Sequence, residues 1–329
     1  LFTSLVLFFT SQTLAKTSSH HEQVGWLTPP PGQQTIGDGH GDIEVAKDGK
    51  VYVSVKGKPN NGIQIYSAKG KYLGNVPNAP ADLHDFKLHT AKDGIEYIYG
   101  AHLTGQRFFK MTIGGKKLIN IDAASVIPEK YKKKSKNGKY ALRLTSIAIS
   151  ATDDIYVVDG YRADYIHHFD AQGNYIKSFG GKKAPYKFKT CHKIIFDTRF
   201  SPERLTCADR ENNRIVQMDY DGKIIATLKP ELRRPSSFAI YGDHLAIAEL
   251  AGRIAILDKK GKLVMTLGTN ENPKQISTPR VSPKYWQENL VTSPHGIAYD
   301  AEGNLLITEW NKWGRVLFFA KDLHQPSSQ

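Results

Sequence analysis

The sequence is poor in cysteine, which excludes a small fold held together by a framework of disulfides. Only Cys191 and Cys207 are present among 329 residues, whereas disulfide-stabilised scaffolds carry several pairs. Neither cysteine belongs to a Cys-x-x-Cys pair, so a zinc-thiolate site is not expected. Both fall on what we predict to be neighbouring strands, which leaves open either a single bridge or a reduced pair.

Long hydrophobic runs are also scarce. The one apolar stretch of note, residues 1–15 (LFTSLVLFFTSQTLA), ends in a small-residue pattern and is too short to span a bilayer. We interpret residues 1–15 as a signal peptide, which predicts a secreted or periplasmic protein without a membrane span. Residues 16–35 are polar and proline-rich, and we expect them to form an extended segment.

Acidic residues are outnumbered by basic ones, and the formal net charge is +13. Part of the excess comes from a lysine-rich insertion at residues 130–139 (KYKKKSKNGK). Charge runs of this kind usually form solvated loops, and attraction to an acidic polymer or an anionic surface is the alternative. No recognition helix or motif of interleaved aromatic and basic residues is present, so a nucleic-acid partner is not expected.

Sustained helical periodicity is absent as well. Instead, short runs of β-branched and aromatic residues alternate with turn residues, as in GIAYD-AEGN-LLITEW-NKWG-RVLFFA near the C-terminus. Such units recur about every 40 to 60 residues, and we count six. The pattern predicts an all-β fold, a six-bladed β-propeller over residues 36–322, followed by a tail at 323–329. The last unit has only three strands, so we expect a strand from near Trp26 to complete it.

Three histidines take the same place in alternate units, directly before the first strand: His84, His192 and His295. Alternate blades of a six-bladed ring lie a third of a turn apart, so the three imidazoles should converge on the central channel. Such a set with an open position is typical of catalytic zinc, although iron, cobalt or manganese would also fit. The alternative to a metal site is that these histidines are ordinary polar residues of the inner strands, which contact water in the channel. His40 lies one residue out of phase and is a weaker candidate.

A second set of residues ends the second strand of each unit, where the chain returns to the same rim. These residues are Lys56, His102, Tyr161, Arg210, Glu249 and Trp310. We assign to Arg210 a bidentate hold on a substrate carboxylate, and to Tyr161 the role of a base that a nearby cation activates. Rim packing or surface ion pairs are the structural alternative.

Three stretches carry a resemblance to a known family: VVDGYRADYIHHFDAQGNYIKSFG, CADRENNRIVQ and SPHGIAYDAEGNLLITEW. In them the sequence resembles the peptidylamidoglycolate lyases, which are six-bladed propellers of the NHL-repeat type. The resemblance implies that the three blade-start histidines bind one zinc ion and that Tyr161 and Arg210 act at this metal. It also implies a reaction that cleaves a peptidyl-α-hydroxyglycine into a peptide amide and glyoxylate.

The sequence departs from the family pattern at several positions. Lys56 stands where the family has a further active-site arginine, so it keeps the charge but loses the forked geometry. Ser293 replaces a methionine before the last zinc histidine, and Gly296 replaces an aspartate that binds the family's structural calcium. The family's disulfide cysteines do not match Cys191 or Cys207. These differences argue against calcium and leave the substrate open.

The leading hypothesis is a secreted, zinc-dependent carbon–nitrogen lyase in which Tyr161, Arg210 and Lys56 are the catalytic residues. Its substrate would be a small molecule or peptide that carries a carboxylate. One alternative keeps the metal and acts as a lyase or hydrolase on an acidic sugar or a lactone. Another is a non-catalytic NHL propeller that binds protein or glycan across its rim. The sequence leaves the oligomeric state open, with a monomer as the default expectation.

Overall fold

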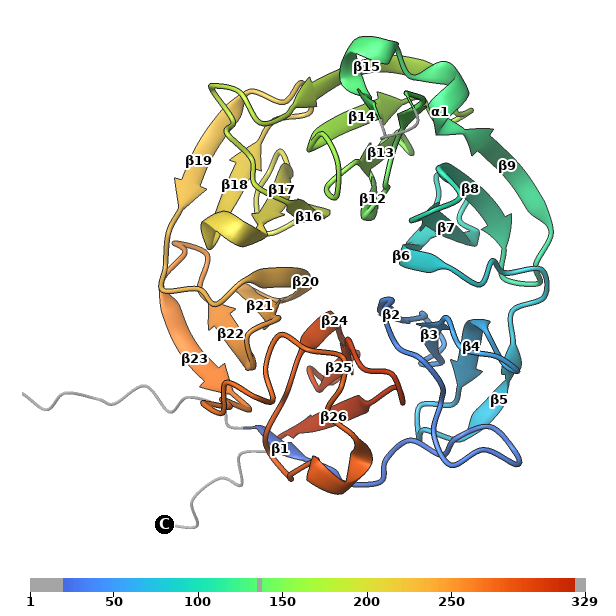
Figure 1. Cartoon of the computed structure of the whole chain (residues 1–329), viewed down its shortest axis with the longest axis vertical. Helices are drawn as coiled ribbons and strands as arrows, with labels where there is room; N and C mark the ends of the chain where they lie inside the picture. Colours follow the sequence, from blue (N-terminus) through green and yellow to red (C-terminus); the bar gives the residue numbers. More distant parts are fainter. Residues whose placement is uncertain (1–19, 135–137, 323–329) are drawn as a thin grey trace, which may run out of the picture.

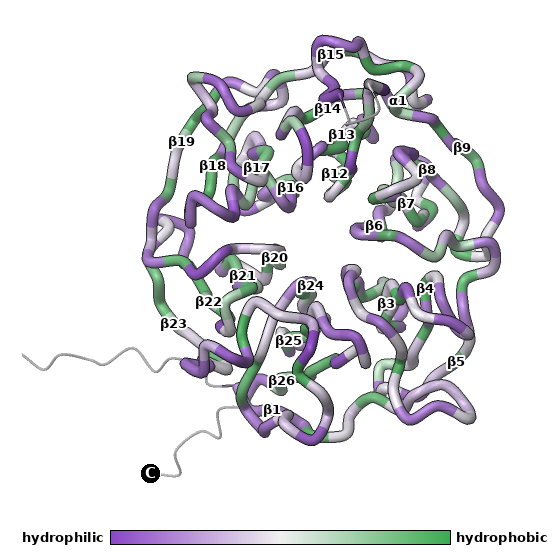
Figure 2. The backbone as a smooth tube through the Cα atoms, in the orientation of Figure 1, coloured by the Kyte–Doolittle hydropathy of each residue, from purple (hydrophilic) through white to green (hydrophobic). Residues whose placement is uncertain are grey.

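The computed structural model describes residues 20–134 and 138–322, which form six four-stranded antiparallel sheets around a central channel (Figure 1). The predicted all-β, six-bladed propeller is therefore confirmed. In Figure 2, green hydrophobic stretches follow the strands inside the blades, whereas the loops carry more purple. This distribution reflects the packing, because each twisted sheet must bury its apolar faces against the two neighbouring blades. The predicted signal peptide and C-terminal tail lie outside the described residues.

The first three blades each run from an inner strand to an outer strand in chain order. They comprise β2 (Ile43–Val45), β3 (Val51–Val55), β4 (Gly62–Tyr66) and β5 (Tyr72–Asn75); β6 (Leu83–Thr90), β7 (Glu96–His102), β8 (Arg107–Thr112) and β9 (Lys117–Asp122); and β12 (Ser146–Ile149), β13 (Ile155–Val158), β14 (Tyr165–Phe169) and β15 (Tyr175–Gly180). A short insertion separates the second blade from the third. It contains α1 (Ala123–Val126), the 3₁₀ turn η1 (Glu129–Tyr131) and the hairpin of β10 (Lys133–Lys134) and β11 (Tyr140–Ala141).

The last three blades follow the same plan, with one exception in the sixth. They comprise β16 (Cys191–Asp197), β17 (Arg204–Asp209), β18 (Arg214–Met218) and β19 (Ile224–Leu228); β20 (Pro235–Tyr241), β21 (His244–Glu249), β22 (Arg253–Leu257) and β23 (Leu263–Leu267); and β24 (Pro294–Tyr299), β25 (Leu305–Glu309) and β26 (Val316–Lys321). Two further 3₁₀ turns are η2 (Arg210–Asn212) and η3 (Pro283–Tyr285).

The sixth blade takes its outer strand from the other end of the chain. β1 (His20–Glu22) pairs antiparallel with β26 and closes the ring (Figure 1). The sequence prediction was right that an N-terminal strand completes this blade, but its position near Trp26 was wrong. Trp26 instead stacks on Phe318, with 5.0 Å between ring centroids. The residues of β1 are polar and give no strand signal, because their pairing depends on backbone hydrogen bonds to β26 rather than on apolar side chains.

The hydrophobic core is divided among the interfaces between blades. One cluster, for example, joins Tyr99 and Phe108 of the second blade to Ile147 and Val157 of the third. Within the fourth blade, a disulfide connects Cys191 and Cys207 on the neighbouring strands β16 and β17, which answers the question that the sequence left open. Over residues 20–134 and 138–322, no helix has the length and apolar character needed to cross a membrane.

Candidate metal centre

β-bulges at the start of three inner strands position the predicted histidines. The ladder between β6 and β7 pairs Leu83 and Asp85 but passes over His84. The same irregularity occurs at His192 in β16 and at His295 in β24. A bulge takes one residue out of the regular alternation of a strand and redirects its side chain. In β6 and β16, the histidine and the residue that follows it can therefore both face the channel.

The structure brings the three histidines of alternate blades together at the channel axis. The ring centroids of His84 and His192 are 4.8 Å apart, those of His84 and His295 are 4.7 Å apart, and those of His192 and His295 are 5.0 Å apart. All three side chains are buried. Burial, together with nearby positive charge, lowers the pKa of each histidine well below its usual value, so the imidazoles are neutral near pH 7.

Each Nδ1 of these histidines meets a backbone carbonyl of the next blade around the ring. The pairs are His84 with Thr145 at 2.7 Å, His192 with Ser236 at 2.7 Å and His295 with Gly41 at 3.1 Å. A carbonyl oxygen can only accept a hydrogen bond, so each Nδ1 must carry the proton and each Nε2 presents a lone pair. Contacts of this kind orient a metal-binding histidine and select its tautomer.

Among the described residues there are fewer hydrogen-bond donors than the three Nε2 lone pairs could accept from. The Tyr161 hydroxyl lies 3.1 Å from Nε2 of His84 and 3.0 Å from Nε2 of His192, but it has one proton and can satisfy only one of them. The buried Nε2 of His295 has no hydrogen-bond partner among the described residues. An unpaired buried polar atom costs about 1–3 kcal/mol. A bound cation would satisfy these lone pairs, and neutral imidazole nitrogens suit zinc.

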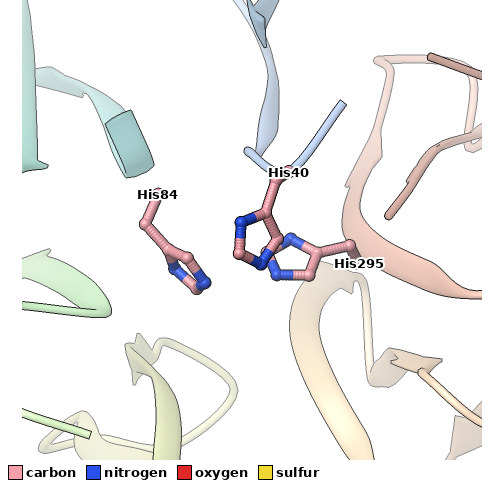
Figure 3. A group of neighbouring side chains, drawn as sticks. All are labelled: His40, His84 and His295. Carbon is pink, nitrogen blue, oxygen red and sulfur yellow. The ribbon is translucent and has the colours of Figure 1, made fainter. Parts of the chain in front are cut away.

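His40, which the sequence indicated only as a weaker candidate ligand, lies among the three predicted histidines. Its ring centroid lies 4.9 Å from those of both His84 and His295. The three rings face one another from separate segments of the chain (Figure 3), and their ligand nitrogens all lie within 4.8 Å of one another. His40 lies in the loop before β2, where Gly39 bridges to Asn311 of the sixth blade. Because His40 lies one residue out of phase with the other three histidines, the phase of the repeats ranked it below them.

Positive side chains surround the mouth of the channel above the histidines. Burial lowers the pKa of His40 to about 4, and the charges of Lys56, Arg210 and Arg143 contribute to this shift. Nη1 of Arg210 donates to the Tyr161 hydroxyl at 3.3 Å, which links the two predicted catalytic residues directly. Tyr161 follows β13, and Arg210 begins η2 directly after β17, so both lie where a second strand returns to the rim.

The mouth contains a cavity of about 290 Å³. Its lining consists of His40, Leu103, Arg143, Tyr161, Arg210, Arg234, Leu250, His295 and Trp310. Three of the six predicted rim residues, Tyr161, Arg210 and Trp310, therefore face one space together with two of the histidines.

The other three rim residues lie outside this lining. Lys56 is exposed on the rim. Nδ1 of His102 contacts a carboxylate oxygen of Asp82 at 2.6 Å, and Glu249 is buried and accepts hydrogen bonds from Arg253. In the second and fifth blades this position is paired locally, with Asp82 and Arg253, and the structure brings none of the three residues to the cavity.

A second polar layer lies directly beneath the histidines and is fully paired within the chain. The ammonium of Lys193, the residue after His192, contacts carboxylates of Asp42 and of Asp85, the residue after His84. Asp85 also accepts hydrogen bonds from the Ser146 hydroxyl and the Ile147 amide, at 2.5 Å and 2.9 Å.

Lys193 is the cation that favours ionised carboxyls in this layer, although burial raises the pKa of Asp42 well above its usual value. Burial opposes ionisation of Asp85, but Lys193 and the hydrogen bonds hold the pKa of its carboxyl below the usual value. Burial would likewise lower the pKa of Lys193, but Asp42, Asp85 and Glu44 raise it. Gly296 makes room for this layer, since a Cβ at that position would lie 2.3 Å from Oδ1 of Asp42. The two carboxylates already hold an ammonium, so they do not fit a calcium ion.

Comparison with solved structures places this chain among propeller proteins. Selenomethionine-substituted virginiamycin B lyase from Staphylococcus aureus gives a TM-score of 0.56 at 15% identity, covering 87% of this chain and 96% of that chain. A catalytically inactive histidine-to-alanine variant of that lyase, with quinupristin, gives 0.52 at 16% identity, covering 93% and 96%. A structural genomics protein of unknown function from Bacteroides thetaiotaomicron gives 0.57 at 15% identity, covering 94% and 71%.

These likenesses establish the fold, and their identities are too low to carry an activity across. Searches of protein-family models and of curated proteins found no match to this sequence.

Proposed function

We propose that this chain is an exported, zinc-dependent lyase similar to peptidylamidoglycolate lyase, which cleaves an α-hydroxyglycine-type carbinolamide into an amide and glyoxylate. One observation carries the proposal: the buried rings of His84, His192 and His295 lie with their centroids within 5.0 Å of one another, beside Tyr161 and Arg210, and Nε2 of His295 has no partner among the described residues. The three sequence stretches that resemble this family contain Tyr161, Arg210 and His295. The fold likeness to virginiamycin B lyase is compatible with lyase chemistry.

The proposed zinc ligands are Nε2 of His84, His192 and His295, with His40 close enough to provide a further nitrogen. When bound, the metal supplies a Lewis acid that polarises the carbinol oxygen of the substrate. The chain fixes the donor atoms in advance, because each Nδ1–H is already engaged by a backbone carbonyl. Calcium is not part of the proposal.

The remaining chemistry falls to Tyr161 and Arg210. Arg210 keeps donors available for the substrate carboxylate, and its Nη1–H donates to the Tyr161 oxygen. Tyr161 is the proposed base that takes the proton from the carbinol hydroxyl. The electron pair of that O–H bond then forms the carbonyl of glyoxylate, the C–N bond breaks, and the amide nitrogen takes the proton back. Lys56 is positioned to contribute charge at the rim rather than contact within the cavity.

Export is part of the proposal and rests on two features. Residues 1–15 have the composition of a signal peptide. Cys191 and Cys207 form a disulfide, and disulfides persist mainly in oxidising compartments such as the periplasm or the cell exterior.

The test combines metal analysis with a product assay. Purified protein should contain about one zinc ion per chain, as expected for one site, and should release glyoxylate from α-hydroxyhippurate. His192→Ala should lose most of the zinc and the activity, whereas His244→Ala, which removes an exposed histidine of β21, should retain both. Full zinc occupancy in His192→Ala would refute the ligand assignment. A zinc-loaded protein that releases no glyoxylate would refute the reaction.

The cationic cavity favours one alternative, a metal-dependent lyase or hydrolase that acts on an acidic sugar or a lactone. Arg143, Arg210 and Arg234 all line the cavity and would hold a sugar carboxylate equally well. Turnover of a uronate or lactone panel by zinc-loaded protein, without glyoxylate release from α-hydroxyhippurate, would favour this alternative.

A further inference from the structure

The cavity above the histidines has three arginines in its lining, each from a different blade. Arg143 precedes β12 of the third blade, Arg210 follows β17 of the fourth, and Arg234 precedes β20 of the fifth. Three guanidinium groups that converge on about 290 Å³ repel one another unless anions neutralise them.

The chain supplies only part of that neutralisation. No carboxylate belongs to the cavity lining. Glu211, next to Arg210, accepts from Nε of Arg210 at 2.9 Å and from Nη2 of Arg234 at 2.7 Å. One negative charge is thus shared between two guanidinium groups, and this pair retains a net positive charge.

Arg143 is left without compensation from the part of the chain that the structure describes. Its backbone N–H donates to Asp159 at 2.6 Å, which anchors the main chain, but its guanidinium has no hydrogen bond or ion pair among the described residues. Nε of Arg234 is likewise buried without a partner there. The charges of Arg143 and Arg210 both act on His40 at the floor of the cavity, so the field within this space is positive.

We propose that the cavity binds a substrate with two acidic groups: Arg210 holds the carboxylate next to the reacting carbon, and Arg143, with Arg234, holds a second carboxylate. The cavity carries two positive charges in excess of Glu211, which a dianion would neutralise. Leu103, Leu250 and Trp310 line the same space and suit a short apolar chain between the two carboxylates. This inference deepens the proposed function, and its binding test does not depend on that function.

The test compares two non-reacting ligands that differ only in the second charge. They are N-succinylglycine and N-succinamoylglycine, in which a neutral amide replaces the second carboxylate and the glycine carboxylate remains. Calorimetry at constant ionic strength should show that wild-type protein binds the dicarboxylate about tenfold or more tightly. Arg143→Gln should reduce this preference to less than about threefold and leave affinity for the amide almost unchanged. The matched control is Arg233→Gln, since Arg233 pairs with Glu271 outside the cavity lining, and it should keep the full preference.

Equal binding of the two ligands by wild-type protein would overturn the proposal, whatever the behaviour of the variants. A preference that survives in both Arg143→Gln and Arg234→Gln would overturn the assignment of the second carboxylate to these arginines. The α-hydroxylated forms of both ligands then separate this proposal from the proposed function. A retained dicarboxylate preference without glyoxylate release refutes only the lyase reaction. Glyoxylate release at equal kcat/KM from both substrates refutes only the second anionic contact.

Discussion

In β6 and β16, adjacent residues belong to two polar levels of the central channel, and the hydrogen-bonding groups of one level are paired whereas those of the other are only partly paired. At the histidine level, Nε2 of His84 and Nε2 of His192 share the one proton of the Tyr161 hydroxyl, and Nε2 of His295 has no partner among the described residues. One residue further along the strands, Lys193 contacts both Asp42 and Asp85. Buried polar groups that serve only the fold are nearly always paired. The lower level therefore behaves as part of the architecture, whereas the unmet hydrogen-bonding capacity of the upper level supports the proposed metal site.

The comparison predicts that the lower level contributes far more to stability than the upper one. Lys193→Met should lower the free energy of unfolding by about 3–5 kcal/mol, because it leaves Asp42 and Asp85 buried without a cation. Urea denaturation of the metal-free proteins measures the change. Lys50→Met removes an ammonium from an exposed pair with Asp48 and should cost less than about 1 kcal/mol. A similar small loss in Lys193→Met would contradict the role assigned to the lower level.

Acid should weaken the metal-free protein through the upper level. The pKa of His40 is lowered to about 4, and those of His84, His192 and His295 are lowered as well. Below about pH 6.5 these four histidines bind protons in the unfolded chain but stay unprotonated in the folded protein. The free energy of unfolding should thus decrease as the pH falls from 6.5 towards 4, by about 1.4 kcal/mol per pH unit for each such histidine.

Urea denaturation at several pH values between 4 and 7 measures this slope. His40→Gln removes one of the four histidines that titrate. The free energy of unfolding should then change less steeply with pH, by the contribution of one histidine. An unchanged slope in this variant would show that His40 is not held neutral in the folded protein.

The smallest stability effect is expected where the histidine level is altered without loss of volume. In the metal-free protein, His295→Gln should change the free energy of unfolding by less than about 1 kcal/mol. The glutamine NH₂ group can still donate to the Gly41 carbonyl, and the glutamine carbonyl oxygen takes the place of the unpartnered Nε2 of His295 as an acceptor. Zinc affinity should nevertheless fall steeply. A large loss of stability in the metal-free form would mean that this ring is structural, like the level below it.

Local patterns explain why the fold could be predicted from the sequence. Each blade is a contiguous unit whose turns and β-rich runs repeat, so the number of blades follows from the chain itself. The closing strand β1 was misplaced because three polar residues carry no periodic signal. The phase of the repeats also brought out His84, His192 and His295, since equivalent positions in alternate blades must lie around one axis.

The rest of the candidate site depends on loops and on contacts across the channel. His40, Arg143 and Arg234 lie in segments that lead into inner strands, and their lengths vary from blade to blade. Lys193 in the sequence looks like an ordinary solvated charge, and only the ring brings Asp42 and Asp85 to it. Lys56, which the family pattern suggested as a catalytic residue, is exposed and lies outside the cavity lining.

The pairing of β1 with β26 has a consequence for biosynthesis. β1 is the first strand of the ring to be synthesised, but it is the last to pair, because its partner β26 is the final strand of the sixth blade. Until then β26 has an open edge, and open edges recruit foreign strands. A nascent chain that stops before β26 cannot form the β1–β26 pair that closes the ring. Without a closed ring, the distances between histidines of different blades are not fixed, and the proposed metal site requires those distances.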